Sequence, residues 1–149
     1  MRDEGMHEAI DNPDHDGGIR TAVRLWFADP AAAKARYGPI ASWDTSGITD
    51  MYALFYYKED FNEDISRWNV SNVVNMEVMF LRATSFNGDL SRWNVSNVKE
   101  MDGMFEGATS FDRHLDGAWS TSTATKPWMF QNSPGTIAGK TKHANGTVE

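Results

Sequence analysis

Apolar positions recur along this chain with a period of 25 residues. The segment 65–89 is repeated at 90–114 with 15 of 25 positions identical, and a more divergent copy occupies 40–64. The apolar positions of the middle copy are Ile65, Trp68, Val70, Val73, Met76, Met79, Phe80 and Phe86. A fixed period of about 20 to 50 residues is typical of repeat architectures. Because one copy cannot bury its apolar face alone, we expect the copies to stack.

Within each copy the spacing predicts a short strand followed by a short helix. Ile65, Trp68 and Val70 follow the L-x-x-L-x-L pattern of leucine-rich repeats, in which a short strand faces the core. From Val73 to Phe80 the apolar residues fall at helical spacing over about two turns. The sequence therefore predicts an α+β repeat solenoid of short leucine-rich-repeat-like coils. Its core would contain a ladder of Trp43, Trp68 and Trp93.

Two helices are predicted in residues 19–39, ahead of the repeats. The first runs from Ile19 to Ala28, because its apolar residues form one stripe, and Asp16 is placed to act as its N-cap. Asp29-Pro30 and the alanines that follow begin a second helix, which Gly38-Pro39 ends. We expect these helices to form an N-terminal helical cap, because the first coil of a stack needs covering.

The remaining segments are less regular. Residues 1–18 are polar and contain Pro13, Gly17 and Gly18, as expected of a flexible lead-in. Residues 115–134 retain Met129-Phe130 at the repeat spacing but carry Trp119 one place late, which indicates a degenerate C-terminal capping coil. Residues 135–149 form a polar tail whose composition predicts disorder.

Composition excludes several classes of protein. The formal net charge of −7 argues against nucleic-acid binding, which needs a basic footprint. The absence of cysteine excludes disulfides, thiolate metal sites and cysteine nucleophiles. No apolar run reaches membrane-spanning length, and residues 1–8 show no apolar signal core. Length and composition therefore predict one globular domain without a transmembrane segment.

A candidate calcium site lies in the lead-in. Asn12, Asp14 and Asp16, followed by Gly17, have the spacing of the first half of an EF-hand loop. Val23 stands where the closing glutamate should be, so the alternative is a polar turn that caps the next helix. These three residues are weak metal candidates.

A second acidic pattern recurs with the repeat. Asp64 and Asp89 occupy equivalent positions, and His114 takes that place in the third copy. A recurring aspartate at a corner usually caps a turn, while shared calcium binding is the alternative reading.

We expect no enzymatic activity and no cofactor. The histidines, His7, His15, His114 and His143, contain no pair at helical metal-ligand spacing. No glycine-rich phosphate loop follows a predicted strand, and no polar constellation breaks the symmetry of the repeat.

Partner-binding candidates are sought among the positions that vary between copies, since the repeated ones are core. The first copy places Tyr52, Tyr56 and Tyr57 at such positions, and tyrosine is favoured at interfaces. The alternative is that these tyrosines pack against Trp26 and Phe27. Two further candidates, Arg67 and Arg92, form a second ladder that would meet acidic partner groups or remain solvated.

The repeat pattern resembles a known family. W-[DN]-V-S-x-V-x-x-M-x-x-M-F, recurring every 25 residues over 40–114, is similar to the mycoplasma-type surface lipoprotein repeats, relatives of BspA-like leucine-rich repeats. The segment 19–46 resembles the lead-in of members from microalgae and related protists. The resemblance implies adhesion or protein–protein interaction at a cell surface, with no assigned biochemical activity.

Three functional hypotheses follow. The first is a non-catalytic protein–protein interaction module built on a short repeat solenoid. The second is a structural accessory subunit of a larger, membrane-associated assembly, for which an ordered 135–149 segment held by neighbours would be the sign. The third is a calcium-dependent surface adhesion protein.

Overall fold

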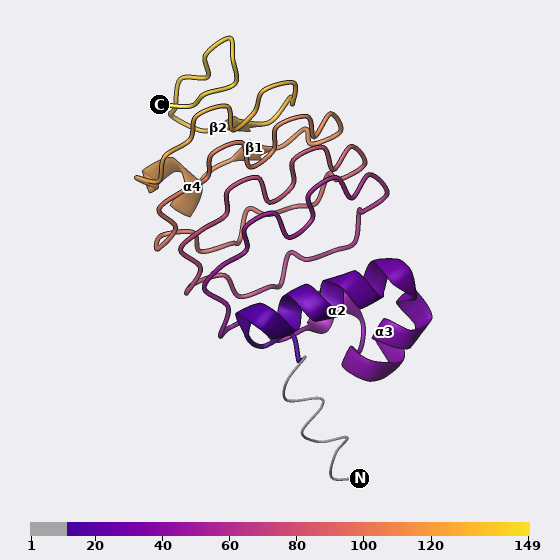
Figure 1. Ribbon diagram of the computed structural model, residues 1–149. Helices are drawn as coiled ribbons and strands as arrows, with labels where there is room; N and C mark the ends of the chain where they lie inside the picture. Colours follow the sequence, from indigo (N-terminus) through magenta and orange to yellow (C-terminus); the bar gives the residue numbers. More distant parts are fainter. Residues whose placement is uncertain (1–11) are drawn as a thin grey trace.

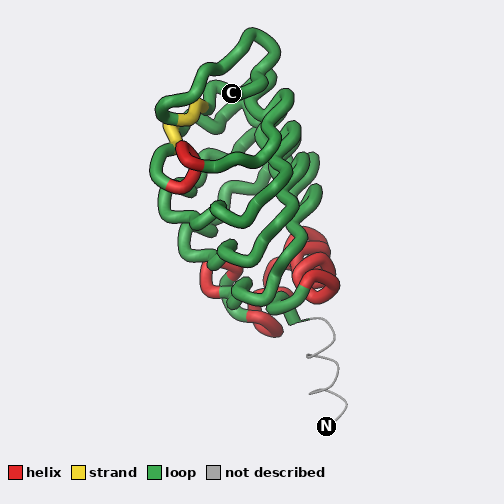
Figure 2. The backbone as a smooth tube through the Cα atoms, turned by 90° about the vertical axis from the view of Figure 1, so that its left-hand side faces the viewer, coloured by secondary structure: helices red, strands yellow, loops and turns green. Residues whose placement is uncertain are grey.

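The computed structural model describes residues 12–149. Its regular elements are α2 (Asp16–Ala28), α3 (Pro30–Tyr37), the 3-10 turn η1 (Ile40–Ser42), β1 (His114–Leu115), α4 (Ala118–Thr121) and β2 (Thr136–Ile137). Turns and irregular chain make up most of the rest (Figure 2). The two longer helices lie at one end of the molecule and the C-terminus lies at the other (Figure 1).

The two predicted N-terminal helices are confirmed. The buried residues of α2 include Ile19, Ala22 and Val23, which fall on one face. At the start of α3, the side chain of Asp29 accepts a hydrogen bond from the Ala32 amide over 3.1 Å. The N-cap assigned to Asp16 is wrong, because α2 begins at Asp16 itself and its carboxylate bonds elsewhere.

The predicted α+β repeat solenoid is wrong. Between residues 43 and 113, all of which are described, there is no helix and no strand, only turns and isolated bridges. Where the pattern predicts a strand, the Trp68 amide bonds the Ile65 carbonyl over 3.1 Å and closes a turn. Where it predicts a helix, the Phe80 amide bonds the Met104 carbonyl of the next copy over 2.8 Å. A leucine-rich-repeat-like strand and helix in every copy are therefore absent from this structure.

Successive copies instead lie side by side and exchange backbone hydrogen bonds. Parallel bridges join Asp50 to Asn75, Asn75 to Glu100, and Glu100 to Thr125. We call the four bridging segments, residues 50–57, 75–82, 100–107 and 125–132, layers one to four. Alternate amides of layer one donate to layer two over 2.8–3.0 Å, and they belong to Met51, Ala53, Phe55 and Tyr57. Between them, the Leu54 and Tyr56 amides bond carbonyls three residues back, and the Tyr52 amide bonds the Asp50 carboxylate. Every amide in this stretch therefore has a partner.

Two positions in each layer have a left-handed backbone. The first has φ between 47° and 59° and is occupied by Ala53, Val78, Gly103 and Trp128. The second has φ between 58° and 72° and is occupied by Tyr57, Arg82, Gly107 and Asn132. A left-handed residue interrupts a right-handed helix, because the following peptide points in another direction. This conformation explains why residues at helical spacing do not form a helix here.

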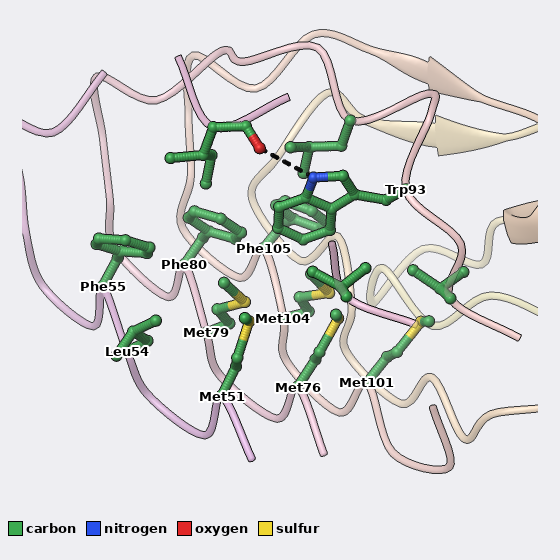
Figure 3. Packing of buried hydrophobic residues seen from close by; sticks show 14 of the residues in the cluster. Met51, Leu54, Phe55, Met76, Met79, Phe80, Trp93, Met101, Met104 and Phe105 are labelled. Carbon is green, nitrogen blue, oxygen red and sulfur yellow. Dashed lines mark hydrogen bonds between the residues drawn. The ribbon is translucent and has the colours of Figure 1, made fainter. Parts of the chain in front are cut away.

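The core consists of aromatic and methionine ladders that cross the layers. The ring centroids of Phe55, Phe80, Phe105 and Phe130 lie 5.5, 5.4 and 5.5 Å apart, and the rings are nearly parallel. Figure 3 shows the first three of these rings in a row above rows of methionines. The expected burial of Trp43, Trp68 and Trp93 is confirmed. The Trp93 indole also donates a hydrogen bond to the Ile65 carbonyl over 3.0 Å.

Both ends of the phenylalanine ladder are covered. At one end the ring of Phe27, from α2, meets Phe55 and Phe61 edge-on, with centroids 6.4 and 5.8 Å apart. At the other end the ammonium group of Lys142 lies 5.4 Å from the centre of the Phe130 ring. The same ammonium group donates to the carbonyl oxygens of Ser133 and Gly135 over 2.7 and 2.8 Å. It therefore satisfies polar groups while it covers an apolar face.

The prediction that residues 135–149 are disordered is wrong. β2 pairs in parallel with β1, with Thr136 opposite His114. Residues 141–149 turn back on themselves through the antiparallel bridge between Lys142 and Val148. The Phe130 amide then donates to the Gly146 carbonyl over 2.9 Å. We call residues 140–149 the terminal hairpin. It is held by layer four of the same chain.

Layer four also contains a buried lysine. Lys126 occupies the place of Met51, Met76 and Met101 in the other layers and is buried. Its ammonium group donates to the carbonyl oxygens of Ser122 and Ala124 over 3.1 and 2.9 Å. Burial, and to a lesser extent Lys140, lowers the pKa of Lys126. These carbonyl bonds compensate for placing a charge at a methionine position.

Candidate interaction surface

Three tyrosines of layer one form an exposed face. Tyr52, Tyr56 and Tyr57 are 48%, 44% and 49% exposed, and we call them the tyrosine face. The rings of Tyr56 and Tyr57 are in contact, with centroids 4.5 Å apart. The Arg82 guanidinium of layer two lies 5.5 Å from the centre of the Tyr57 ring. The structure thus exposes all three tyrosines singled out in the sequence and brings two of them, Tyr56 and Tyr57, into contact.

The alternative position for the tyrosines is met only in part: Tyr57 and Phe27 line one hollow, but among the described residues no ring of the three tyrosines stacks on Trp26 or Phe27. Trp26 contacts Trp43 edge-on, and Phe27 contacts the phenylalanine ladder. Both rings of the helical segment therefore pack against core aromatics, and the tyrosine face remains open to solvent.

A hollow of 260 Å³ adjoins the tyrosine face where α2 lies against layer one. Arg20, Arg24, Lys58 and Tyr56 are among the residues that line it, and we call it the basic hollow. The Lys58 ammonium group lies 4.8 Å from the centre of the Phe27 ring, at the edge of this hollow. One guanidinium nitrogen of Arg20 donates to the Tyr52 carbonyl over 2.7 Å. Another lies 3.6 Å from the Asp50 carboxylate. These two contacts hold the Arg20 side chain in place.

Arg67 and Arg92 do not belong to this surface. Arg67 lines a different hollow together with Asp64 and Trp43. Arg92 lies close enough to Asp89 to help lower the pKa of that carboxyl group, after the stronger effect of hydrogen bonds from Ser91. Each arginine is therefore next to a turn aspartate, and neither lines the basic hollow.

Asn12, Asp14 and Asp16 do not form a metal-binding loop in the structure. The Asp16 carboxylate accepts hydrogen bonds from the Thr49 amide and hydroxyl, both over 2.8 Å, and from the Asp50 amide over 3.2 Å. Burial alone would raise the pKa of Asp16, but these hydrogen bonds outweigh it and lower the pKa. Asp16 therefore fastens α2 to layer one. Within residues 12–149, no group of three or more histidine and carboxylate side chains is arranged to hold a metal ion.

The recurring aspartates of the turns accept hydrogen bonds from residues two places later. Asp64 and Asp89 each accept from a serine amide, that of Ser66 and of Ser91, over 3.0 Å. Hydrogen bonds from the hydroxyl and amide of Ser66 lower the pKa of Asp64 below its ordinary value of 3.8. Asn69 builds the same kind of turn with Ser71. These carboxylates therefore act as turn acceptors.

These turns predict a loss of stability in acid. A carboxylate whose pKa is lower in the folded state stabilises it above the unfolded pKa of 3.8, and this stabilisation disappears as pH falls through the lower folded value. We expect the melting temperature to decrease once the pH is lowered below about 4. We expect the double variant Asp64→Asn, Asp89→Asn to show a weaker dependence, because Asn keeps the acceptor and does not titrate. Thermal unfolding between neutral pH and about pH 2 measures this.

The matched control for this experiment is Glu59→Gln with Glu63→Gln. It removes two carboxylates from exposed side chains of the first copy. A control that flattened the pH dependence as much as the aspartate variant would contradict the role of the turns.

Sequence reasoning missed the cationic residues Arg20, Arg24 and Lys58. Lys58 carried a signal, because the equivalent residues Ala83 and Ala108 are small and apolar in the next two copies. The two arginines lie on α2, and only the packing of α2 against layer one brings them to the tyrosines.

None of the helices within residues 12–149 has both the length and the apolar character needed to cross a bilayer.

Comparison with known proteins identifies one family. No curated protein and no solved structure matches the chain. A family model described as "Mycoplasma protein of unknown function, DUF285" matches residues 23–139, which include all three repeats, α3 and part of α2. The match agrees with the resemblance to mycoplasma-type repeats noted from the sequence. Since it covers most of the chain, the protein belongs to the DUF285 family.

Proposed function

We propose that this protein is a non-catalytic protein–protein interaction module that binds its partner through the tyrosine face. The observation that carries the proposal is the exposure of Tyr52, Tyr56 and Tyr57, each 44% or more, beside a buried core. Tyrosine contributes a large contact area and a hydrogen-bonding tip while losing little conformational freedom. Three adjacent tyrosines therefore have the composition of a binding hot spot.

The rest of the first layer supports this assignment. Its core residues, Met51, Leu54 and Phe55, are buried, so the fold does not need the tyrosines for its interior. In layers two and three the equivalent positions hold Glu77, Leu81, Asp102 and Glu106, among others. At these three positions, aromatic side chains are thus found in layer one alone. The resemblance to surface lipoproteins favours a partner that is met at a cell surface.

The test is complex formation by a tyrosine variant. We expect the wild-type chain to elute with a stoichiometric partner from its native cell extract in size-exclusion chromatography. The triple variant Tyr52→Ser, Tyr56→Ser, Tyr57→Asn should elute alone with an unchanged melting temperature. Asn is chosen at the last position because Asn132 already occupies it in layer four with φ of 58°. Each lost anchor is expected to weaken binding by about 1–2 kcal/mol.

Trp128→Ser is the matched control. Trp128 is equally exposed, at 50%, but it lies in layer four, at the other end of the stack. The proposal would be contradicted if Trp128→Ser alone abolished binding of the partner, or if the triple tyrosine variant still bound it.

The other two hypotheses gain no specific support. The accessory-subunit hypothesis expects neighbouring proteins to hold an ordered 135–149 segment. Here β2 and the terminal hairpin are held by the same chain. Calcium-dependent adhesion would need several carboxylates gathered round one ion, and residues 12–149 contain no such group of three or more.

A further inference from the structure

We infer that the basic hollow receives a glutamate side chain from an acidic segment of the partner protein. This inference rests on the proposed binding function and specifies the chemistry of the partner at the same surface.

Charge is the first argument. Arg20, Arg24 and Lys58 line one hollow, in a chain whose formal net charge is −7. Among residues 12–149 no carboxylate lines this hollow, and neither Arg24 nor Lys58 forms an ion pair with a described residue. Arg20 is oriented by the Tyr52 carbonyl and by Asp50. A cationic site on an acidic protein is complementary to an anionic partner group.

The second argument is that the hollow breaks the repeat. Lys58 stands where Ala83 and Ala108 are fully buried in the next copies. Ala53 stands where layer four has Trp128, with φ of 55° at both positions. The first copy thus combines a small residue, as the third copy also has at Gly103, with a charged residue that the other copies lack at the position of Lys58. Stacking alone does not require either difference, because the equivalent positions form the same hydrogen bonds without them.

The third argument concerns the shape of the ligand group. Val23, Ala53 and Leu54 supply an apolar wall, and Tyr56 supplies part of an aromatic ring. Apolar atoms around cations match a side chain that has methylene groups below its carboxylate, which glutamate has. The volume of 260 Å³ admits a side chain but not a helix, whose diameter is about 10–12 Å. A bare inorganic anion would leave the apolar wall unused.

The probe for the test is a fluorescently labelled peptide of alternating Glu and Gly, and binding to the full chain is measured by anisotropy. We expect the Glu peptide to bind and a matched Gln peptide not to bind. The variant Arg24→Gln with Lys58→Gln should weaken binding about tenfold, because it removes two charge-assisted contacts. Arg67→Gln with Arg92→Gln removes the same charge outside the basic hollow and should leave binding unchanged.

A second variant separates shape from charge. Ala53→Trp fills the hollow without changing the net charge, and the left-handed position accepts Trp because Trp128 occupies it in layer four. We expect this variant to fold normally, with a melting temperature close to that of the wild type, and to lose the Glu peptide. The inference would be overturned if both charge variants weakened binding of the Glu peptide equally, or if the Gln peptide bound as well. It would also be overturned if Ala53→Trp still bound the Glu peptide, or if inorganic phosphate at low concentration displaced it.

Failure of this inference can be distinguished from failure of the proposed function. A natural partner that is lost by the triple tyrosine variant but retained by Arg24→Gln with Lys58→Gln leaves the interaction module intact and removes the glutamate site. A partner that both variants retain contradicts the tyrosine face and the glutamate site together.

Discussion

The variant Phe80→Ala is expected to lower the free energy of unfolding by about 3–5 kcal/mol. Phe80 is completely buried in the middle of the ladder, with Phe55 at 5.5 Å on one side and Phe105 at 5.4 Å on the other. It also stacks on Phe86 of its own copy, with a centroid distance of 4.3 Å. Alanine would therefore leave a cavity bounded by three rings that backbone hydrogen bonds hold in their layers.

Chemical denaturation measures this change, and Phe80→Leu is its control. Leucine retains most of the buried apolar volume but loses the ring contacts, so its loss should be about half as large. The exposed Tyr52→Ala, in the neighbouring layer, should change stability by less than about 0.5 kcal/mol. A loss below about 1 kcal/mol for Phe80→Ala would show that the ladder rearranges and does not hold a fixed stack.

The second large effect is expected for Gly146→Ala in the terminal hairpin. Gly146 has φ of 83°, and a Cβ atom there would lie 2.0 Å from the backbone nitrogen of Gln131. Backbone atoms of layer four cannot move aside as a flexible side chain can, so the hairpin must separate from that layer. Its separation breaks the hydrogen bond from the Phe130 amide to the Gly146 carbonyl. We expect a loss of about 2–4 kcal/mol from strain together with lost backbone bonds.

Gly139→Ala separates the steric effect from the conformational one. Gly139 has a similar φ of 76°, but apart from its chain neighbours no atom lies within 4 Å of the position that a Cβ atom would take there. The variant should lose only the left-handed penalty of about 1–2 kcal/mol. Hydrogen exchange should show a faster Phe130 amide in Gly146→Ala and an unchanged one in Gly139→Ala. Equal stability losses in the two variants would contradict the close packing of the hairpin on layer four.

The local patterns of the sequence led to a wrong conformation within the repeats. Val73, Met76, Met79 and Phe80 have a spacing that suits two helical turns, and every one of these side chains is buried. The same burial is reached when residues such as Val78 take a left-handed conformation and alternate amides bond the next layer. Valine is a poor left-handed residue, so local preference did not reveal this. Gly103 and Gly107 of the third copy carried the available signal, since glycine favours that backbone.

Only the tyrosines of the candidate surface could be predicted from the repeat pattern. Tyr52, Tyr56 and Tyr57 were found because they vary where the core does not, and this argument needs only an alignment of the chain with itself. Arg20 is 32 positions away from Tyr52 in the chain, and no repeat relates the two residues. Its position beside the tyrosines depends on how α2 lies across layer one, where hydrogen bonds to the Asp16 carboxylate hold the helix.

By itself, the sequence determined the period of the chain, the presence of two helices ahead of the repeats, and the membership of the core. These features depend on side-chain polarity and on short-range caps, which are readable residue by residue. Only the tertiary structure decided the backbone conformation of the repeats, the folding of the terminal hairpin and the presence of the basic hollow. In all three, the deciding hydrogen bond or contact comes from a segment far away along the chain, as when the Phe80 amide bonds Met104.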